Sequence, residues 1–544
     1  MPIDMTEVEA EIPTIDMAAS APAAYKPSED ERDNYFHGFS GSPKLVARTG
    51  HRPWEKSMFE SDSWTPEVKQ HRKCYMAIVD SVMAEKWTMD ISKRIIAALG
   101  RCKWSYFFPI RTCLRGDSPR GLRGTEATVM LVAVEPASLE WEDAIKIALS
   151  CRAILRHFGI LDIEVEILEG GYTRHAASAE LEALIDNKDQ PAIKEKIRPL
   201  LSYPGYPVAY LENRSGQGTV GLHVKLVARG EEDADDTVYG LTCRHVVCGN
   251  RAAQESYKPS SKDQLSTGHQ YYIQANANTF NSIWSSLQDI METREAQVAY
   301  LQRIITEWDE LLQYDNPKNI SPPSDQNRHQ LAAKQQTLAY SKVLLEQLAQ
   351  IEDKKQRQIG QLAFLPTFTQ SSQHRGYLRD WALIKLDSKK FPRAPDNTVY
   401  LGPLSTFRDR TDELALMLRD KTMDVFESLV VAKRGARTGL TEGTKSRIEA
   451  VVRHPGDGLD EDVYTWEYLI VPKPGTDHFS APGDSGSAIF DFAGRVVGIV
   501  TASSAIPADE AVELPKGTHI TFAAPIEWVM DDIQDFTGKQ VRLA

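Results

Sequence analysis

The sequence predicts a multidomain protein of mixed α and β structure, in which an all-β region is interrupted by a helical hairpin and preceded by an α/β domain. A β-branched run, an amphipathic helix and an alternating strand follow one another between residues 126 and 169. Short β-type runs broken by Gly and Pro begin near Tyr203 and return after residue 362. Between them, residues 280–362 carry apolar side chains in steps of three and four.

The N-terminal part divides into a tail and a domain. Residues 1–30 are rich in Ala, Pro and acidic residues without periodicity, so we expect a disordered tail. The α/β domain then covers 31–200, and we expect its segment 71–87 to be helical. The segment 111–124 places four arginines among glycines. It is interpreted either as a solvated loop or as a site for a phosphate group or an acidic partner.

The all-β region is expected in two parts, 203–279 and 363–544, on either side of the insertion 280–362. Two apolar seams in the insertion are separated by the Pro-rich segment 316–325, which cannot continue a helix. An antiparallel helical hairpin brings its two ends together and projects far from the β region. We therefore expect it to bind a protein partner or a second copy of the chain. A last helix is expected at 525–533.

Composition excludes several classes of protein. The 544 residues include 63 basic and 76 acidic ones, a net charge of −13, which argues against a general grip on nucleic acid or on anionic membranes. No run of about 18 apolar residues occurs. The N-terminus lacks the basic and apolar regions of a secretory signal. The six cysteines end at Cys248, which favours a reducing compartment, the cytoplasm or the nucleus.

Three motifs carry the chemistry. Ser485 lies between glycines in APGDSGSA, a turn that suits an activated hydroxyl. A hydroxyl needs a base, and His245 in LTCRHVV supplies one. The base needs a carboxylate to fix its tautomer, and Asp380 in RDWALIKL supplies that. His245 and Asp380 are 135 residues apart, of which 83 belong to the insertion, so 52 remain.

In this order and spacing the motifs resemble those of the trypsin/chymotrypsin-like serine peptidases, nearest in style to fungal intracellular members with N-terminal prodomains. The resemblance implies a chymotrypsin-like double β-barrel and an endopeptidase that acts on protein substrates without a cofactor, in regulatory proteolysis. The catalytic residues would be His245, Asp380 and Ser485. The amides of Gly483 and Ser485 would form the oxyanion hole. The implied substrate-binding residues are Phe479, Thr501, Ala502, Ser503 and Gly517.

The stretch 431–444 resembles the Lys-x-Gly-x-x-Thr-Gly segment of disulfide-free members of this family. The chain also departs from the family pattern. GDSGSA replaces the usual GDSGGP, and no activation site precedes the barrel, so we do not expect a new N-terminus to pair with Asp484.

Other interpretations stay open from the residues alone. The chain could be a catalytically silent trypsin-like fold that acts as a protein-interaction scaffold, or a regulatory scaffold that binds nucleotide or phosphate through 111–124. Phe479 could be an ordinary core residue. Cys243, His245 and Cys248 suggest zinc, but a structural zinc site needs four ligands, and no second pair stands at ligand spacing. We therefore expect no metal.

Overall fold

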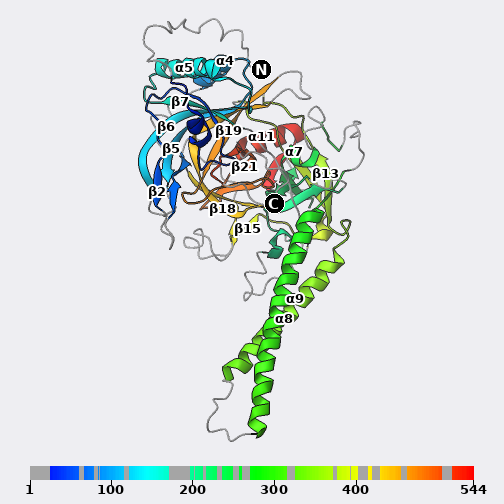
Figure 1. The fold of residues 1–544 in the computed structure, drawn as a ribbon. Coiled ribbons are helices and arrows are strands. Elements are labelled where there is room, and N and C mark those ends of the chain that lie inside the picture. The colour runs from blue at the N-terminus through cyan, green and yellow to red at the C-terminus, as the bar shows by residue number, and fades with distance from the viewer. Residues whose placement is uncertain are drawn as a thin grey trace.

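The fold is taken from a computed structural model. It describes residues 25–60, 67–78, 84, 86–87, 89–115, 122–170, 196–200, 202–211, 216–228, 236–248, 256–259, 270–314, 325–371, 376–391, 394–401, 415–418, 429–454, 462–504 and 517–544. Two large β-sheets lie at the centre of the molecule, two helices cover one end, and a pair of long helices projects from the opposite end (Figure 1).

The first sheet carries the segments that contain His245 and Asp380. Its eight strands include the last strand of the chain, which pairs with β10. In spatial order they are β23 (Gln540–Leu543), β10 (Leu222–Val227), β11 (Tyr239–Thr242), β14 (Ala382–Leu386), β13 (Gln358–Phe364), β12 (Tyr271–Ile273), β8 (Tyr206–Tyr210) and β9 (Gly218–Val220). The short helix α7 (Arg244–Cys248) follows β11 directly.

The second sheet carries the Ser485 segment. Six of its strands close on themselves, because β18 pairs with both β17 and β19. These strands are β17 (Leu429–Gly435), β18 (Gly439–His454), β19 (Val463–Pro472), β20 (Ala488–Asp491), β21 (Val496–Ser503) and β22 (Thr521–Pro525). Helix α11 (Ile526–Thr537) follows β22 in the region where a last helix is expected. It ends at Gly538, whose left-handed φ of 73° suits a glycine cap.

Strands from the N-terminal region continue this second sheet. Strand β5 pairs with the far half of β18, with Phe107 opposite Val451 and Tyr106 opposite Val452. Eleven strands therefore form one sheet, a pairing that the sequence analysis did not predict. The N-terminal strands are β1 (Leu45–Arg48), β4 (Arg72–Met76), β5 (Trp104–Arg115), β6 (Leu122–Val134) and β7 (Glu164–Glu169).

The two faces of the N-terminal strands pack against different layers. Along β6, Met130 and Val132 belong to the cluster that includes helices α4 (Met89–Leu99) and α5 (Trp141–His157). The alternate residues Leu131 and Ala133 belong to the cluster that reaches the barrel strands. This period of two is what a strand buried on both faces requires. The parallel pairing of β6 and β7 around α5 agrees with the predicted strand–helix–strand unit.

Two predictions for the N-terminal region need correction. The segment 71–87, expected to be helical, begins with strand β4, because Arg72–Met76 pair with β5 and alternate between half-buried and buried. Residues 79–83 lie outside the described part. The expected tail 1–30 also lies outside it up to residue 24, but helix α2 (Glu29–Asn34) already begins within that range.

Two long helices, α8 (Ala277–Tyr314) and α9 (Asp325–Gln350), pack side by side within the predicted insertion (Figure 1). The second helix ends at Gln350. The predicted insertion ends too late, at residue 362, because Ile359 and Leu362 lie in β13 and are buried in the first sheet. Among the described helices, none combines the length and apolar character needed to cross a bilayer.

Two small hairpin-like pairs complete the strands that the structure describes. They are β2 (Met58–Glu60) with β3 (Val68–Gln70), and β15 (Thr398–Tyr400) with β16 (Ala415–Met417).

Candidate active site

His245 and Asp380 meet at the end of the first sheet. His245 lies in α7, after β11, and Asp380 lies two residues before β14, the strand that pairs with β11. The Nδ1 atom of His245 is 2.6 Å from Oδ2 of Asp380, and the His245 backbone N–H donates to Oδ1 at 3.0 Å. Both carboxylate oxygens thus hold His245, whose Nδ1 carries the proton and whose Nε2 is left as the basic atom.

The residues on either side of Asp380 fix its position. Arg379 Nε and Trp381 Nε1 both donate to Oδ2 of Asp532 in α11, at 2.9 and 2.6 Å. The Asp380 side chain is fully buried, and the His245 side chain is 5% exposed. A buried carboxylate with two donors is a strong acceptor, so this pair is a rigid unit rather than a surface ion pair.

The Ser485 turn depends on glycines on both sides. Gly483 has a φ of 117° and Gly486 a φ of 94°, conformations that other residues rarely adopt. A Cβ on Gly486 would lie 2.2 Å from the backbone oxygen of Thr219, so the turn also needs the missing side chain there. The Gly483 carbonyl accepts from Thr219 Oγ1 at 2.9 Å, which orients the peptide between Gly483 and Asp484.

Backbone bonds bring this turn to the start of the histidine helix. The Thr219 N–H donates to the Ser485 carbonyl at 2.8 Å. The Val500 carbonyl accepts both the Gly486 N–H, at 2.8 Å, and the Cys243 thiol, at 3.2 Å. Cys243 is two residues before His245, so the three predicted catalytic residues come from adjacent segments. The Ser485 hydroxyl itself donates to the Thr501 carbonyl at 3.0 Å.

A buried ion pair between Lys433 and Asp484 stabilises the Ser485 turn. Asp484 accepts from Thr438 Oγ1 at 2.6 Å and from the Arg437 N–H at 2.8 Å, and Lys433 Nζ lies 3.2 Å away. Gly435 has no room for a side chain, because its Cβ would lie 2.2 Å from Asp484 Oδ1. The Lys-x-Gly-x-x-Thr-Gly segment thus surrounds Asp484. The motif can be found in the sequence, but its partner Asp484 becomes evident only in the fold.

The charges in this ion pair are shifted by burial and by each other. Burial alone would raise the pKa of Asp484, but the Lys433 ammonium and the hydrogen bonds from Thr438 and two backbone amides lower it overall. Burial lowers the pKa of Lys433 to about 8, and the Asp484 carboxylate opposes that fall. Lys433 thus places a positive charge beside Asp484 from within the chain.

The predicted substrate-binding residues of the barrel are buried. Phe479 is fully buried among Val431, Tyr468 and other apolar side chains, which is the core environment that the alternative interpretation expected. Thr501, Ala502 and Ser503 are at most 3% exposed and lie on β21. The Thr501 hydroxyl donates to Glu467, a buried carboxylate that the sequence analysis did not single out.

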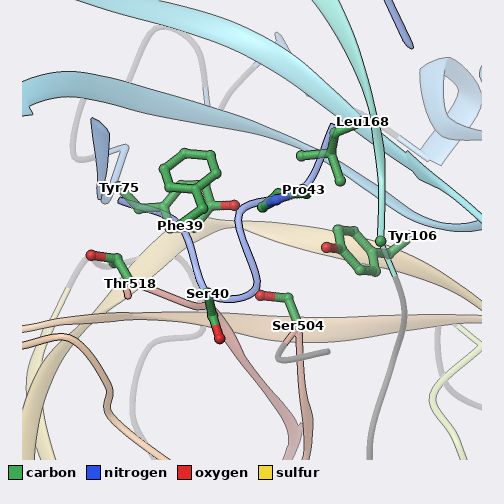
Figure 2. Close-up of a pocket in the computed structure, with 9 residues that line it drawn as sticks. Phe39, Ser40, Pro43, Tyr75, Tyr106, Leu168, Ser504 and Thr518 are labelled. Atoms are coloured by element: carbon green, nitrogen blue, oxygen red, sulfur yellow. The ribbon is translucent and has the colours of Figure 1, made fainter. Parts of the chain in front are cut away.

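The fifth such residue, Gly517, lies against the N-terminal segment of the chain. A Cβ on Gly517 would lie 2.7 Å from the Phe39 backbone. Beside it, the Thr518 N–H donates to the Gly38 carbonyl at 2.8 Å, and the Ser40 N–H donates to the Thr518 carbonyl at 3.0 Å. Figure 2 shows this segment between Thr518 and Ser504 on one side and Tyr75 on the other. Segment 38–40 therefore packs directly against Gly517.

In the part of the chain that the structure describes, the residues of the zinc and phosphate interpretations do not form a complete binding site. Cys243, His245 and Asp380 offer three ligand atoms within 4.8 Å of one another, but Nδ1 and Oδ2 already bond to each other, and the thiol bonds to Val500. Of the segment 111–124, Arg111 and Arg115 belong to strand β5, while residues 116–121 lie outside the described part.

Comparisons with known proteins add little. No protein-family model matches the chain, and no curated protein matches it. Among solved structures, one similar chain is described as a glutamic-acid-specific serine protease that uses a histidine triad in substrate binding. It is 18% identical, covers 34% of this chain and 74% of its own length, and has a TM-score of 0.22. A likeness this weak carries no argument about the fold or the function, and the candidate site rests on the geometry described above.

Proposed function

We propose that this chain is a serine endopeptidase whose catalytic residues are Ser485, His245 and Asp380. The observation that carries the proposal is the double hydrogen bond between His245 and Asp380, next to the glycine-bounded turn of Ser485. A buried carboxylate that fixes the Nδ1–H tautomer serves no obvious structural need at a strand end. It is what a histidine base requires.

The proposed reaction has two steps, acylation of Ser485 and hydrolysis of the acyl ester, and His245 transfers protons in both. The Ser485 Oγ attacks the scissile carbonyl carbon as His245 Nε2 takes its proton, and Asp380 stabilises the imidazolium. The amides of Gly483 and Ser485 bind the oxyanion. His245 then gives the proton to the leaving amine, so the peptide C–N bond breaks and an acyl ester on Ser485 remains. Water, deprotonated by His245, hydrolyses that ester.

We infer that the arrangement described here is a resting one. The Ser485 hydroxyl donates to the Thr501 carbonyl, so it must rotate to give its proton to His245. Segment 38–40 bonds to Thr518 beside Gly517, one of the implied substrate-binding residues, so a substrate that used Gly517 would have to displace this segment or pass it. Both features support a protease that acts only after a rearrangement, as regulatory proteolysis requires.

Labelling with a fluorophosphonate probe tests the proposal, because the probe reacts only with an activated serine. The chain with segment 38–40 released should be labelled, and Ser485→Ala and His245→Ala in the same background should not. The matched control is Ser388→Ala, on an exposed 3₁₀ turn of the first sheet, which should label like the unsubstituted chain. Peptide hydrolysis should fall by about 10⁴-fold in either catalytic variant, and by little more in the double variant.

The rival function, a catalytically silent scaffold on the same fold, predicts the opposite result. An unlabelled chain that remains folded, with segment 38–40 removed or released, would favour the scaffold and overturn the protease. Substrate preference is a separate question. By the resemblance, Phe479 would lie at the base of the pocket for the P1 side chain, a role that its full burial allows only after a rearrangement. For that rearranged state we propose an uncharged residue at the P1 position, because Phe479 offers no carboxylate to pair an Arg or Lys. A peptide-library profile dominated by basic P1 residues would contradict that preference.

A further inference from the structure

Two cysteines of the N-terminal strands face each other directly. Cys74 on β4 and Cys113 on β5 are register partners in an antiparallel pair. Their sulfur atoms are 2.6 Å apart, and both cysteines are free thiols. The separation is only about half an ångström longer than the ~2.05 Å of a disulfide bond.

The backbone already has the geometry that a bond between them needs. Residues directly opposite in an antiparallel pair have Cα atoms about 4.5–5.5 Å apart. Disulfide-bonded cysteines span about 4.4–6.8 Å between Cα atoms, so the strands need not move. The thiols of Cys243 and Cys248 donate instead to the carbonyls of Val500 and Arg244.

The surroundings favour reaction at this pair. Cys74 is half-buried and can be reached from solvent, whereas Cys113 is 4% exposed. The hydrogen bond between the two thiols lowers the pKa of Cys113 and raises that of Cys74, so the pair gives up its first proton more easily than its second. Burial opposes the fall at Cys113, and the Arg111 and Arg115 guanidiniums on either side of it add to the fall. A cysteine between two cations is held toward the thiolate, the form that attacks a disulfide.

We propose that Cys74 and Cys113 form a reversible disulfide, a redox modification site in the N-terminal part of the sheet. The oxidant is a low-molecular-weight disulfide. Once the pair has lost one proton, the other is shared between the two sulfurs, so the solvent-accessible Cys74 sulfur attacks one sulfur of the small disulfide and releases the first small thiol. The Cys113 thiolate then attacks the Cys74 sulfur of the mixed disulfide and releases the second. Two electrons pass to the small disulfide, and the two protons of the cysteines end on the two thiols released.

The position of the pair gives the bond a structural consequence. Arg72, two residues from Cys74, is paired with Asp477 at 3.3 Å, just before Phe479. The neighbouring Lys73 N–H donates to the His37 carbonyl at 2.5 Å, at the start of the segment that covers Gly517. A covalent link between β4 and β5 would hold that segment in place. The bond itself can be measured whether or not the chain is a protease.

Thiol counting in glutathione buffers tests the proposal. The full-length chain is equilibrated at a series of ratios of oxidised to reduced glutathione, quenched in acid, alkylated and mapped by mass spectrometry. As the buffer becomes oxidising, the unsubstituted chain should lose two of its six alkylatable thiols together. A single cross-linked peptide pair should contain Cys74 and Cys113, and reduced thioredoxin should restore both thiols.

Serine substitutions provide the controls. Cys113→Ser should instead accumulate glutathione on Cys74, and Cys102→Ser should still lose the pair. Circular dichroism checks that each variant is folded, and mapping of the unsubstituted chain needs no variant. If Cys74 and Cys113 remain alkylated in fully oxidised buffer, or if Cys74 holds glutathione while Cys113 stays free, the proposal is wrong.

Discussion

The N-terminal region and the α8–α9 pair are both additions to the two central sheets, but they are attached in different ways. The N-terminal strands hydrogen-bond to β18 and share an apolar cluster with the barrel. The cluster of the α8–α9 pair contains residues of the helices themselves and only a few from the base, such as Leu200 and Ala275. Figure 1 shows the pair projecting from one end. The N-terminal region, joined by strand pairing, should fold together with the barrel. The α8–α9 pair is attached only at its base, so it can be shortened or altered without unfolding the sheets.

Removing the N-terminal region should have the largest effect. A chain that starts at residue 202 would expose the far half of β18 and apolar side chains such as Leu469 and Phe522. We expect aggregation or loss of cooperative unfolding, measured by size-exclusion chromatography and thermal circular dichroism. Deletion of residues 1–24 is the control and should leave both unchanged. If the chain from residue 202 were soluble and active, the N-terminal region would not be part of the same folding unit as the barrel.

Shortening the helical pair should leave the chemistry intact. Arg294 Nη1 donates to the Thr337 carbonyl at 2.8 Å, so residues 295–336 can be replaced by a linker of about four Gly and Ser residues, since helix axes pack about 8–10 Å apart. Hydrolysis of a small peptide ester should stay within about twofold, whereas cleavage of the natural protein substrate should fall. Loss of both activities in a folded variant would mean that the helices support the active site.

Two ion pairs should show the same difference between the N-terminal region and the α8–α9 pair in their contribution to stability. Arg48 and Glu31 in the N-terminal region are 5% and 0% exposed, whereas Lys342 and Glu295 on the helices are 50% and 44% exposed. Arg48→Met should lower the free energy of unfolding by about 3 kcal/mol, because it leaves a buried carboxylate without its cation. Lys342→Met should lower it by less than about 1 kcal/mol. Urea titrations of both variants measure the difference, and equal effects would contradict it.

The smallest expected effect is on the alkaline limit of activity, which should depend on Lys433 and not on the helices. The pKa of Lys433 lies near 8, so raising the pH above that value removes the positive charge that faces Asp484. Activity should therefore fall above pH 8, and Lys433→Arg should extend activity to higher pH because a guanidinium stays charged. Lys433 lies in the barrel, so the chain with shortened helices should keep the same alkaline limit. A limit that moves with the helices would instead tie them to the Ser485 turn.

Local patterns predicted part of this structure well. The unit of β6, α5 and β7 follows from periodicity, and the motifs around His245 and Asp380 anticipated a contact across 135 positions. The pairing of β5 with β18 cannot be predicted from the local sequence, because the backbone groups at the edge of a strand are the same for every partner strand. The run at Arg72–Met76 predicts a helix because its spacing also fits one, but it forms strand β4 through its pairing with β5. The partner of Lys433 could not be predicted, since only the folded turn brings Asp484 to it.

The ladder between β5 and β18 also has a consequence during synthesis. Arg453 Nη1 donates to the Trp104 carbonyl, a bond between residues 349 positions apart. At roughly 5–20 residues per second, a ribosome needs on the order of tens of seconds to make that stretch. Throughout this time the stretch of β5 at Tyr106 and Phe107 lacks its partner strand, although α8 and α9 can pair as soon as both emerge. The nascent N-terminal sheet is therefore the part of this chain with most need of a chaperone.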